Sequence, residues 1–375
     1  MKMITKPIGL YVHIPLCIRK CNYCDFCSHP IDTVEWRNEY IQALCAEMEC
    51  YRGKGISLNS IFFGGGTPSL LTVDELSLIV SKIRDIFILS DDIEFTIEAN
   101  PKTVDKEKIE GFISLGVNRI SLGLQSIHDN EMKILGRVHN YDDFIESYNV
   151  VKSAGVENVN VDLMYGIPLQ TMSSFEKTLD EIIRFSPEHI SLYGLIIEDE
   201  TPFGREKAKL NLPSDDTECD MYDLACKRLR EAGYDHYEIS NYARDGHYCR
   251  HNMKYWQEEE YIGIGVAAHS YYCGRRFGNT NDISAYLMGD RAKYDHGEVV
   301  SPEDEAYEFV MLGLRLGVGI SLSEYYHRFG IQFLDGREAV VKSLASAGYL
   351  KIADDRLFLT ERGFYVSNLI LNELI

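Results

Sequence analysis

The chain has 375 residues, of which 45% are hydrophobic and 26% are charged, and its formal net charge at pH 7 is −20. This acidic balance argues against a nucleic-acid-binding surface, which needs clustered Lys and Arg, but it leaves room for a small basic pocket for a carboxylate-bearing ligand. No segment reaches the roughly 18 apolar residues of a membrane span, and the N-terminal MKMITKPIGL lacks a signal-peptide core. We therefore expect a cytoplasmic protein without a transmembrane segment, whose ten cysteines serve as ligands or buried thiols.

Apolar β-rich runs alternate with amphipathic helical runs through the first half of the chain. Strands are expected at residues 9–14, 59–63, 93–98, 119–124, 157–163 and 189–196. Helices are expected at residues 34–52, 73–87, 105–115, 141–154, 173–185 and 215–232. Repeated β–α units form a parallel sheet covered by helices, and six units are too few for an eight-fold barrel. We therefore predict an α/β fold with a partial, open (β/α)6 barrel.

Polar features recur toward the carboxyl ends of these expected strands. They are the cysteine loop after the first strand, GGGTP (residues 64–68) after the second, Glu98, Gln125, Asp162, and Tyr193 within the sixth. Barrel-type folds build their active sites at this edge of the sheet. The positions therefore support one another as parts of one site, although Glu98 and Asp162 could singly be cap or turn residues.

The stretch YVHIPLCIRKCNYCDFC begins with the first expected strand and carries three cysteines at C-x3-C-x2-C spacing. Thiolates of Cys17, Cys21 and Cys24 on a cubane-type iron–sulfur cluster would leave one iron without a protein ligand, where chemistry could occur. Two alternatives stay open. A structural zinc site would need a fourth ligand such as Cys27 or His29, and the three cysteines could also be buried structural thiols.

The cysteine spacing, with aromatic Tyr23 just before the last cysteine, resembles the signature of the radical S-adenosylmethionine (SAM) superfamily. The fuller string resembles one branch of it, which holds the oxygen-independent coproporphyrinogen III oxidases and the HemW heme chaperones. The resemblance spans nearly the whole chain. It implies a [4Fe–4S] cluster on the three cysteines, an electron donor, and a bound SAM whose reductive cleavage yields a radical that abstracts hydrogen.

The turn GGGTP lacks the Lys of a phosphate-binding loop, and a glycine-rich turn is weak evidence of a site by itself. Its place after the cysteine loop matches the family's glycine motif, which holds the methionine part of SAM. In the oxidase branch, matching positions contact one or the other of two SAM molecules. The positions carried over are Tyr11, Gly65, Gly66, Thr67, Glu98, Gln125, Arg137 and Asp162.

Aromatic and histidine residues are dense after residue 233, and HNMKYW (residues 251–256) matches the HNxxYW motif of the HemW-type chaperones. In those proteins the His is associated with heme binding. A neutral imidazole of His251 could ligate heme iron, while Tyr255 and Trp256 could pack beside the macrocycle. In a strand-rich linker, a buried His and Trp are more often packing residues than heme contacts. Weaker candidate ligands are His236, His247 and His269.

Residues 301–375 indicate a separate module of helices with a short β-hairpin turning at Asp354 and Asp355. This pattern suggests a winged-helix-like domain, but it carries no basic stripe for nucleic acid, so we interpret it as a lid or docking element over the barrel. The expected division is a barrel at 1–233, an extension with the HNxxYW motif at 234–300, and this module at 301–375.

Two functions compete. The first is a heme chaperone that binds heme or a related tetrapyrrole and delivers it to an accepting protein. The second is an enzyme, an oxygen-independent coproporphyrinogen III oxidase or a radical SAM enzyme acting on another tetrapyrrole. The complete HNMKYW, the short segment before Tyr11, and Phe26 in place of the oxidases' additional Cys favour the chaperone.

Overall fold

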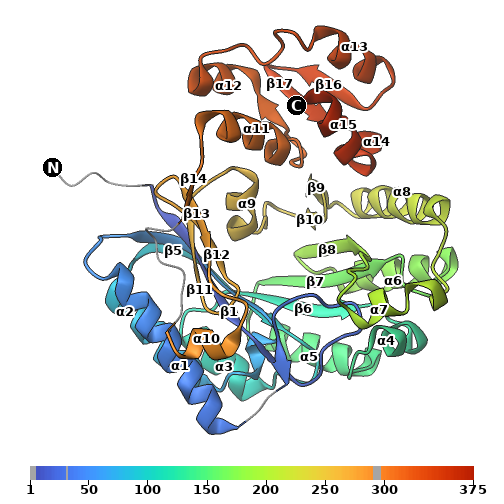
Figure 1. Cartoon of the computed structure of the whole chain (residues 1–375). Helices are drawn as coiled ribbons and strands as arrows, with labels where there is room; N and C mark the ends of the chain where they lie inside the picture. The colour runs from blue at the N-terminus through green and yellow to red at the C-terminus, as the bar shows by residue number, and fades with distance from the viewer. Residues whose placement is uncertain (1–5, 31–32, 290–296) are drawn as a thin grey trace.

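The computed structural model describes residues 6–30, 33–289 and 297–375, and within them twelve strands form one sheet. Their order is β14-β13-β12-β11-β1-β4-β5-β6-β7-β8-β10-β9. The two edge strands, β14 and β9, are not paired with each other, so the sheet curves without closing (Figure 1). Residues 1–5 of MKMITKPIGL and residues 290–296 of the expected extension lie outside the described residues.

All six expected strands are present and run parallel in chain order. They are β1 (Ile8–Ile14), β4 (Ser57–Gly65), β5 (Ile88–Ala99), β6 (Arg119–Gln125), β7 (Asn158–Tyr165) and β8 (His189–Gly194). Most of their side chains are buried on both faces, as parallel strands covered by helices require. The expected partial, open barrel of six β–α units is confirmed.

The region expected as an extension contributes strands to the same sheet, which the sequence did not predict. β11 (Tyr261–Ile264) pairs parallel with β1, where Gly9 faces Tyr261. The other strands of this region are β9 (Asp235–Glu238), β10 (Asn241–Ala243), β12 (His269–Tyr272), β13 (Arg275–Gly278) and β14 (Glu298–Val299). β10 and β9 continue the sheet beyond β8, and β12 to β14 continue it beyond β11. A short pair, β2 (Leu16–Cys17) and β3 (His29–Pro30), closes the base of the cysteine loop.

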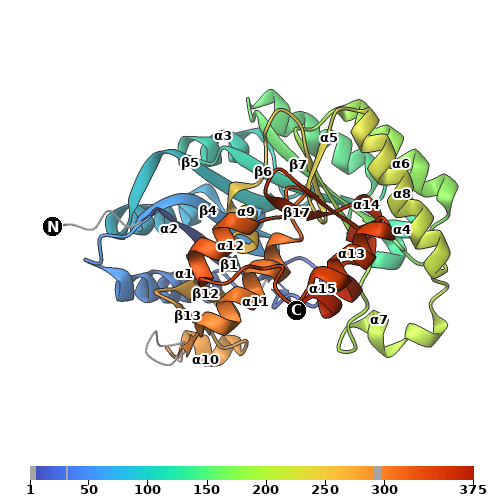
Figure 2. The same ribbon diagram turned by 90° about the horizontal axis from the view of Figure 1, so that it is seen from above.

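Helices connect the parallel strands and pack against one another around the outside of the sheet (Figures 1 and 2). In the barrel they are α1 (Val34–Met48), α2 (Val73–Ile86), α3 (Lys106–Ser114), α4 (Asp129–Leu135), α5 (Tyr141–Ser153), α6 (Met172–Phe185), α7 (Pro202–Arg205) and α8 (Asp215–Glu231). Two more, α9 (Arg250–Trp256) and α10 (Ile283–Leu287), lie between strands of the region after residue 233. The six expected helices are confirmed, whereas α4, α7, α9 and α10 were not anticipated.

Local sequence signals explain where these helices begin and end. Thr72 and Glu75 form a capping box at the start of α2, and Asn140 and Asp143 form another at the start of α5. The chain leaves α5 through Gly155, whose φ of +92° is a left-handed conformation that glycine adopts without steric cost. These signals are local in the sequence, so they locate the ends of these helices without reference to any long-range contact.

The C-terminal module holds α11 (Pro302–Gly313), α12 (Leu322–Phe329), α13 (Glu338–Ser346), α14 (Glu361–Tyr365), α15 (Ser367–Leu374) and the strands β15 (Ile320–Ser321), β16 (Leu350–Ala353) and β17 (Arg356–Leu359). β16 and β17 are antiparallel, and Asp354 and Asp355 both have positive φ, so the expected hairpin is confirmed. No helix in the described part of the chain is long and apolar enough to cross a bilayer.

Backbone hydrogen bonds fasten this module to the edge of the main sheet. The Ile239 amide donates to the Arg315 carbonyl at 2.9 Å, and the Gly317 amide donates to the Tyr237 carbonyl at 2.9 Å. Glu238 and Leu316 form an antiparallel bridge between them. The module, red in Figure 1, therefore lies over the end of the sheet that carries β8, β9, β10 and α9.

Candidate functional site

A cavity of about 140 Å³ lies at the carboxyl end of the parallel strands, next to the cysteine loop, and we call it the cysteine cavity. Of the twelve positions named as candidate ligands, ten line it: Cys17, Cys21, Cys24, Gly65, Gly66, Thr67, Glu98, Gln125, Arg137 and Asp162. They come from six separate loops and strand ends between residues 17 and 162. The fold therefore brings together the polar features that the sequence placed after successive strands.

The cysteine loop is anchored on α4, one of the helices that the sequence analysis missed. The Asn22 amide donates to the Leu135 carbonyl at 2.9 Å, and the Asn22 side chain donates to the Ile134 carbonyl at 2.8 Å. Cys17 Sγ lies 3.8 Å from Thr67 Oγ1, at the glycine-rich turn. The loop thus has fixed contacts on both sides of the cavity.

The thiols of this cavity suit an iron–sulfur cluster better than a single metal ion. Among the residues that the structure describes, no three His, Cys, Asp or Glu side chains converge so that they could hold one ion. The Cys27 thiol instead points to the Asn281 carbonyl, 3.5 Å away. Burial raises the pKa of Cys24 to about 11, so its thiolate needs a compensating cation such as iron. A four-ligand zinc site with Cys27 or His29 finds no support in this geometry.

The glycine-rich turn is tight because two strand ends meet there. A Cβ atom at Gly66 would lie 2.4 Å from the Leu16 carbonyl oxygen, and one at Gly65 would lie 2.4 Å from the His13 ring. The Gly66 amide donates to the Ile14 carbonyl at 2.8 Å. The glycines thus permit close approach of the chain to itself as well as exposing backbone groups to the cavity.

Two carboxyl groups form the floor of the cavity. Burial, together with the nearby Asp162, raises the pKa of Glu98 to about 8, although the Gly65 amide donates to it at 3.1 Å. Burial also raises the pKa of Asp162, which accepts hydrogen bonds from Asn160 at 2.7 Å and Ser121 at 3.2 Å. At neutral pH Glu98 therefore holds a proton and can donate a hydrogen bond to a ligand.

Arg137 and Gln125 complete the polar wall. The Arg137 guanidinium donates to Cys21 Sγ at 3.5 Å, to the Gly123 carbonyl at 2.6 Å and to Asn100 Oδ1 at 2.5 Å. Gln125 has a strained φ of +69°, and its Oε1 is buried without a hydrogen-bond partner among the described residues. An orphaned acceptor, a fixed cation and three thiols fit a site for an iron–sulfur cluster with a zwitterionic amino acid beside it.

A second cavity of about 240 Å³, which we call the barrel cavity, adjoins the first inside the barrel. The remaining two candidates, Tyr11 and His251, line it. The two cavities share Phe26, Gly65, Glu98 and Asp162 as walls. The Tyr11 hydroxyl lies 3.1 Å from His13 Nδ1. Tyr11 and His251 therefore face the barrel interior rather than the cysteine loop.

His251 sits in the first turn of α9 and is 1% exposed. Its Nδ1 lies 3.0 Å from Ser60 Oγ, and its Nε2 lies 2.8 Å from the Tyr255 hydroxyl. Its ring stacks on Phe62 at a centroid distance of 5.3 Å. Burial and the nearby Lys254 lower the pKa of His251 to about 3, so the ring is neutral. A histidine metal ligand must be neutral in this way, but both ring nitrogens of His251 already make hydrogen bonds.

The weaker histidine candidates lie away from these cavities. His236 stacks on Tyr242 at 4.2 Å, and His269 pairs with Gly278 between β12 and β13. The His247 amide donates to the Arg244 carbonyl in a turn. Of the described side chains that line the cysteine-loop and barrel cavities, none belongs to these three residues.

Sequence reasoning missed several polar residues that line the two cavities, among them Asn100 and Arg119. Asn100 follows Glu98 by two residues at the same strand end and lines the cysteine cavity, a spacing that could have revealed it. Arg119 is 2% exposed at the start of β6 and lines the barrel cavity. A charged Arg in an otherwise uncharged strand, RISLGLQ, is the signal that was available.

Comparison with known proteins decides the family. Residues 11–182 match the radical SAM superfamily model, and residues 300–366 match the HemN C-terminal domain model. The chain is 36% identical to heme chaperone HemW of Synechocystis over 85% of this chain and 80% of that protein. It is 35% identical to heme chaperone HemW of Bacillus subtilis over 96% of both. The chain belongs to the HemW family of radical SAM proteins.

Membership of the HemW family agrees with the fold. The crystal structure of coproporphyrinogen III oxidase (HemN) from Escherichia coli, a radical SAM enzyme, superimposes with a TM-score of 0.85 over 98% of this chain and 90% of that chain. Its sequence identity is 21%, so this likeness concerns the fold alone. The radical SAM family implies a [4Fe–4S] cluster and SAM as cofactors, and the cavity under the cysteine loop fits them.

Proposed function

We propose that this protein is a heme chaperone, which binds heme or a related tetrapyrrole and passes it to an accepting protein. The observation that carries the proposal is identity of 34–36% to curated HemW chaperones over nearly the full length of the chain. The motif HNMKYW forms α9, which borders the barrel cavity. Phe26, where the oxidases have an additional Cys, lines both cavities.

Cys17, Cys21 and Cys24 would hold the [4Fe–4S] cluster, which, when bound, supplies one-electron chemistry on SAM and needs an electron donor. The Arg137 guanidinium, 3.5 Å from Cys21 Sγ, would stabilise the negative thiolate. Gln125 Oε1 and the backbone of the glycine-rich turn would orient the amino and carboxylate groups of SAM. The other SAM contacts proposed are Tyr11, Gly65, Gly66, Thr67, Glu98 and Asp162.

We also propose a cytoplasmic location. All ten cysteines are free thiols, which suits a reducing compartment. The division of the chain at residues 233 and 300 stays a proposal as well, since strands on both sides of residue 233 belong to one sheet.

The proposal that His251 ligates heme iron requires a change in this geometry. The Tyr255 hydroxyl would have to leave His251 Nε2, 2.8 Å away, before the nitrogen could bind iron. We expect His251→Ala to lose the ligand-type absorbance band of bound heme while it keeps cluster and SAM. His327→Ala serves as the control, because His327 is exposed on α12 and lines neither the barrel cavity nor the cavity next to the C-terminal module.

The deciding experiment combines a heme titration with anaerobic product analysis on the reconstituted protein. We expect heme binding and no efficient SAM-dependent conversion of coproporphyrinogen III to protoporphyrinogen IX. Efficient conversion, or the absence of heme binding in the wild type, would replace the chaperone with the alternative, an oxygen-independent coproporphyrinogen III oxidase or another tetrapyrrole enzyme.

A further inference from the structure

A third cavity, of about 670 Å³, opens between the end of the main sheet and the C-terminal module. Its walls come from β8, α8, α9 and the segment α14–α15. The volume lies within the range of about 300–1,000 Å³ that is typical of small-molecule sites. We call it the aromatic pocket, because seven of the described residues that line it are aromatic: Tyr165, Tyr193, Tyr222, Tyr255, Trp256, Phe364 and Tyr365.

The aromatic pocket leaves large ring surfaces open to solvent. Tyr193 is 40% exposed and Tyr365 is 41% exposed, on opposite sides of the pocket in β8 and α14. Neighbouring Ile196 is 72% exposed. Exposed apolar surface that gathers in a concave site marks a ligand-binding site, and flat rings suit a planar, largely apolar ligand.

The aromatic pocket also has a positively charged side chain, that of Arg315. Arg315 is the single basic side chain among the described residues of the pocket. Its guanidinium donates to Asn368 Oδ1 at 3.1 Å and lies 6.0 Å from the centroid of the Trp256 ring. Two acids, Glu218 and Glu238, also line the pocket. Burial raises the pKa of Glu238 to about 7, which weakens its repulsion of an anion near neutral pH.

The aromatic pocket also touches the barrel cavity. Tyr193, Asn252 and Tyr255 line both cavities, and two of them belong to HNMKYW. Tyr255 and Trp256 thus face the aromatic pocket, whereas His251 lies behind Tyr255, bonded to its hydroxyl. The motif therefore presents its aromatic rings, and not its imidazole, to the larger cavity.

We infer that the aromatic pocket recognises the porphyrin ring and its carboxylates directly. A metal-free porphyrin therefore binds there, and so does heme. The ring packs against the aromatic side chains, and one carboxylate pairs with Arg315. Ligation of iron adds to this binding but is not needed for it. The inference rests on the proposed heme-binding function and specifies which part of the ligand is recognised.

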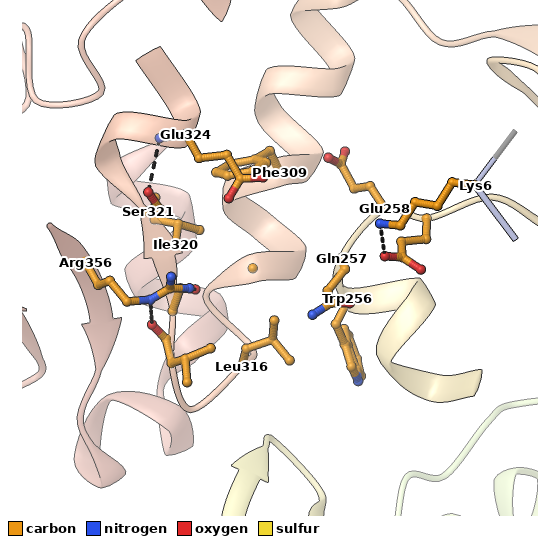
Figure 3. A pocket seen from close by; sticks show the side chains of 14 residues that line it. Lys6, Trp256, Gln257, Glu258, Phe309, Leu316, Ile320, Ser321, Glu324 and Arg356 are labelled. Carbon is orange, nitrogen blue, oxygen red and sulfur yellow. Dashed lines mark hydrogen bonds and ion pairs between the residues drawn. The ribbon is translucent and has the colours of Figure 1, made fainter. Parts of the chain in front are cut away.

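A smaller cavity on the other side of Trp256 offers a contrast (Figure 3). It measures about 260 Å³ and is lined by charged side chains, among them Lys6, Glu258, Glu324 and Arg356. Arg356 donates to the Val318 and Gly319 carbonyls, so its charge serves the module itself. Two of its described lining residues, Trp256 and Phe309, are aromatic, against seven in the aromatic pocket, and its volume is less than half as large.

The test uses Trp256 as the reporter. The chain has two tryptophans, and Trp36 packs on Tyr40 away from the pocket, so Trp36→Phe leaves Trp256 as the sole fluorescent indole. We expect saturable quenching of Trp256 fluorescence by metal-free protoporphyrin IX. Arg315→Gln in this background should weaken the binding about tenfold, as expected for loss of a charge-assisted contact. Arg362→Gln is the matched control, because Arg362 stacks on Tyr349 in the same module and does not line the pocket.

A second variant tests whether a loss of porphyrin binding comes from the pocket itself rather than from misfolding. Tyr365 is half exposed, so Tyr365→Ala should keep the thermal unfolding transition and still weaken porphyrin binding severalfold. If heme binds but metal-free porphyrin does not, or if Arg315→Gln and Tyr365→Ala both bind it as tightly as the parent, the inference is wrong while heme binding stands. If neither heme nor porphyrin binds the parent protein, the proposed function fails.

Discussion

At the residue scale, the four cysteines of the loop differ in what surrounds their sulfur atoms. Cys17, Cys21 and Cys24 line the cysteine cavity, whereas Cys27 Sγ contacts the Asn281 carbonyl. We therefore predict that Cys17→Ala, Cys21→Ala and Cys24→Ala each abolish the [4Fe–4S] cluster after anaerobic reconstitution. Cys27→Ala should retain it, as measured by iron content and visible absorbance. Loss of the cluster in Cys27→Ala as complete as in the others would contradict a three-cysteine site.

Asp162 tests the SAM site separately from the cluster. Its carboxyl lies on the cavity floor, where Asn160 and Ser121 hold it in place. We expect Asp162→Ala to weaken SAM binding about tenfold, the loss of one good polar contact, with unchanged cluster absorbance. Calorimetry on the reconstituted protein measures this, and exposed Asp91→Ala is the control. Unchanged SAM affinity in both Asp162→Ala and Glu98→Ala would contradict the placement of the SAM site at the carboxyl ends of the strands.

The raised pKa of Glu98 leads to a prediction about how the stability of the protein depends on pH. Its pKa rises from an ordinary value of 4.5 to about 8 on folding, so the folded protein binds a proton that the unfolded chain releases between these values. The free energy of unfolding of the cluster-free protein should therefore fall as pH rises from about 5 to 8, by roughly 2–4 kcal/mol. Glu98→Gln should flatten this part of the profile in chemical denaturation. An equally steep fall in Glu98→Gln would assign the dependence to other groups.

Sequence reasoning placed most of the candidate residues in one cavity because strand ends in a parallel sheet meet at one edge. It identified ten residues that share the cysteine cavity before any contact was known. It could not foresee that His251 has both nitrogens engaged, since its partner Ser60 lies 191 residues away in the chain. Such pairings depend on register between strands and helices that no local pattern encodes.

At the element scale, α9 depends on a cap supplied by another strand. Glu94, in β5, accepts hydrogen bonds from the Arg250 and His251 amides at 2.9 and 3.0 Å. A seven-residue helix has little intrinsic stability, so this cap fixes the direction of Tyr255 and Trp256.

We predict that Glu94→Ala lowers the free energy of unfolding by about 2–3 kcal/mol, because it leaves the Arg250 and His251 amides at the start of α9 without their acceptor. Heme binding should weaken at the same time. Thr72→Ala, which removes the exposed cap of α2, should cost about 1 kcal/mol and leave heme binding unchanged. Equal loss of heme binding in the two variants would show that general stability, and not the position of α9, controls the ligand.

This long-range cap also explains why α9 was not predicted as a helix. Its N-cap residue, Cys249, makes no side-chain cap hydrogen bond, and the sequence around it is dense in strand-favouring aromatic residues. By contrast, α2 and α5 carry complete capping boxes and were predicted within two residues of their ends. Local signals locate a helix well only where the stabilising groups are themselves local.

At the scale of the whole molecule, the six β–α units were predictable because each strand pairs with the strand of the preceding unit. The continuation of the sheet was not, since β11 pairs with β1 across some 250 residues of sequence. Strands β9 to β14 have two to four residues each, too short for a clear alternating pattern. What the sequence suggested as an extension beside the barrel is, in three dimensions, both edges of its sheet.

The three cavities stand in a row, and neighbours share walls: Glu98 and Asp162 between the first two, Tyr193, Asn252 and Tyr255 between the last two. An occupant that moves a shared side chain changes the free energy of binding on its other side. Thermodynamic linkage makes that effect mutual, so the factor by which SAM alters porphyrin affinity must equal the factor by which porphyrin alters SAM affinity. Because the cavities have walls in common, we expect SAM and the proposed porphyrin ligand to act as allosteric effectors of each other.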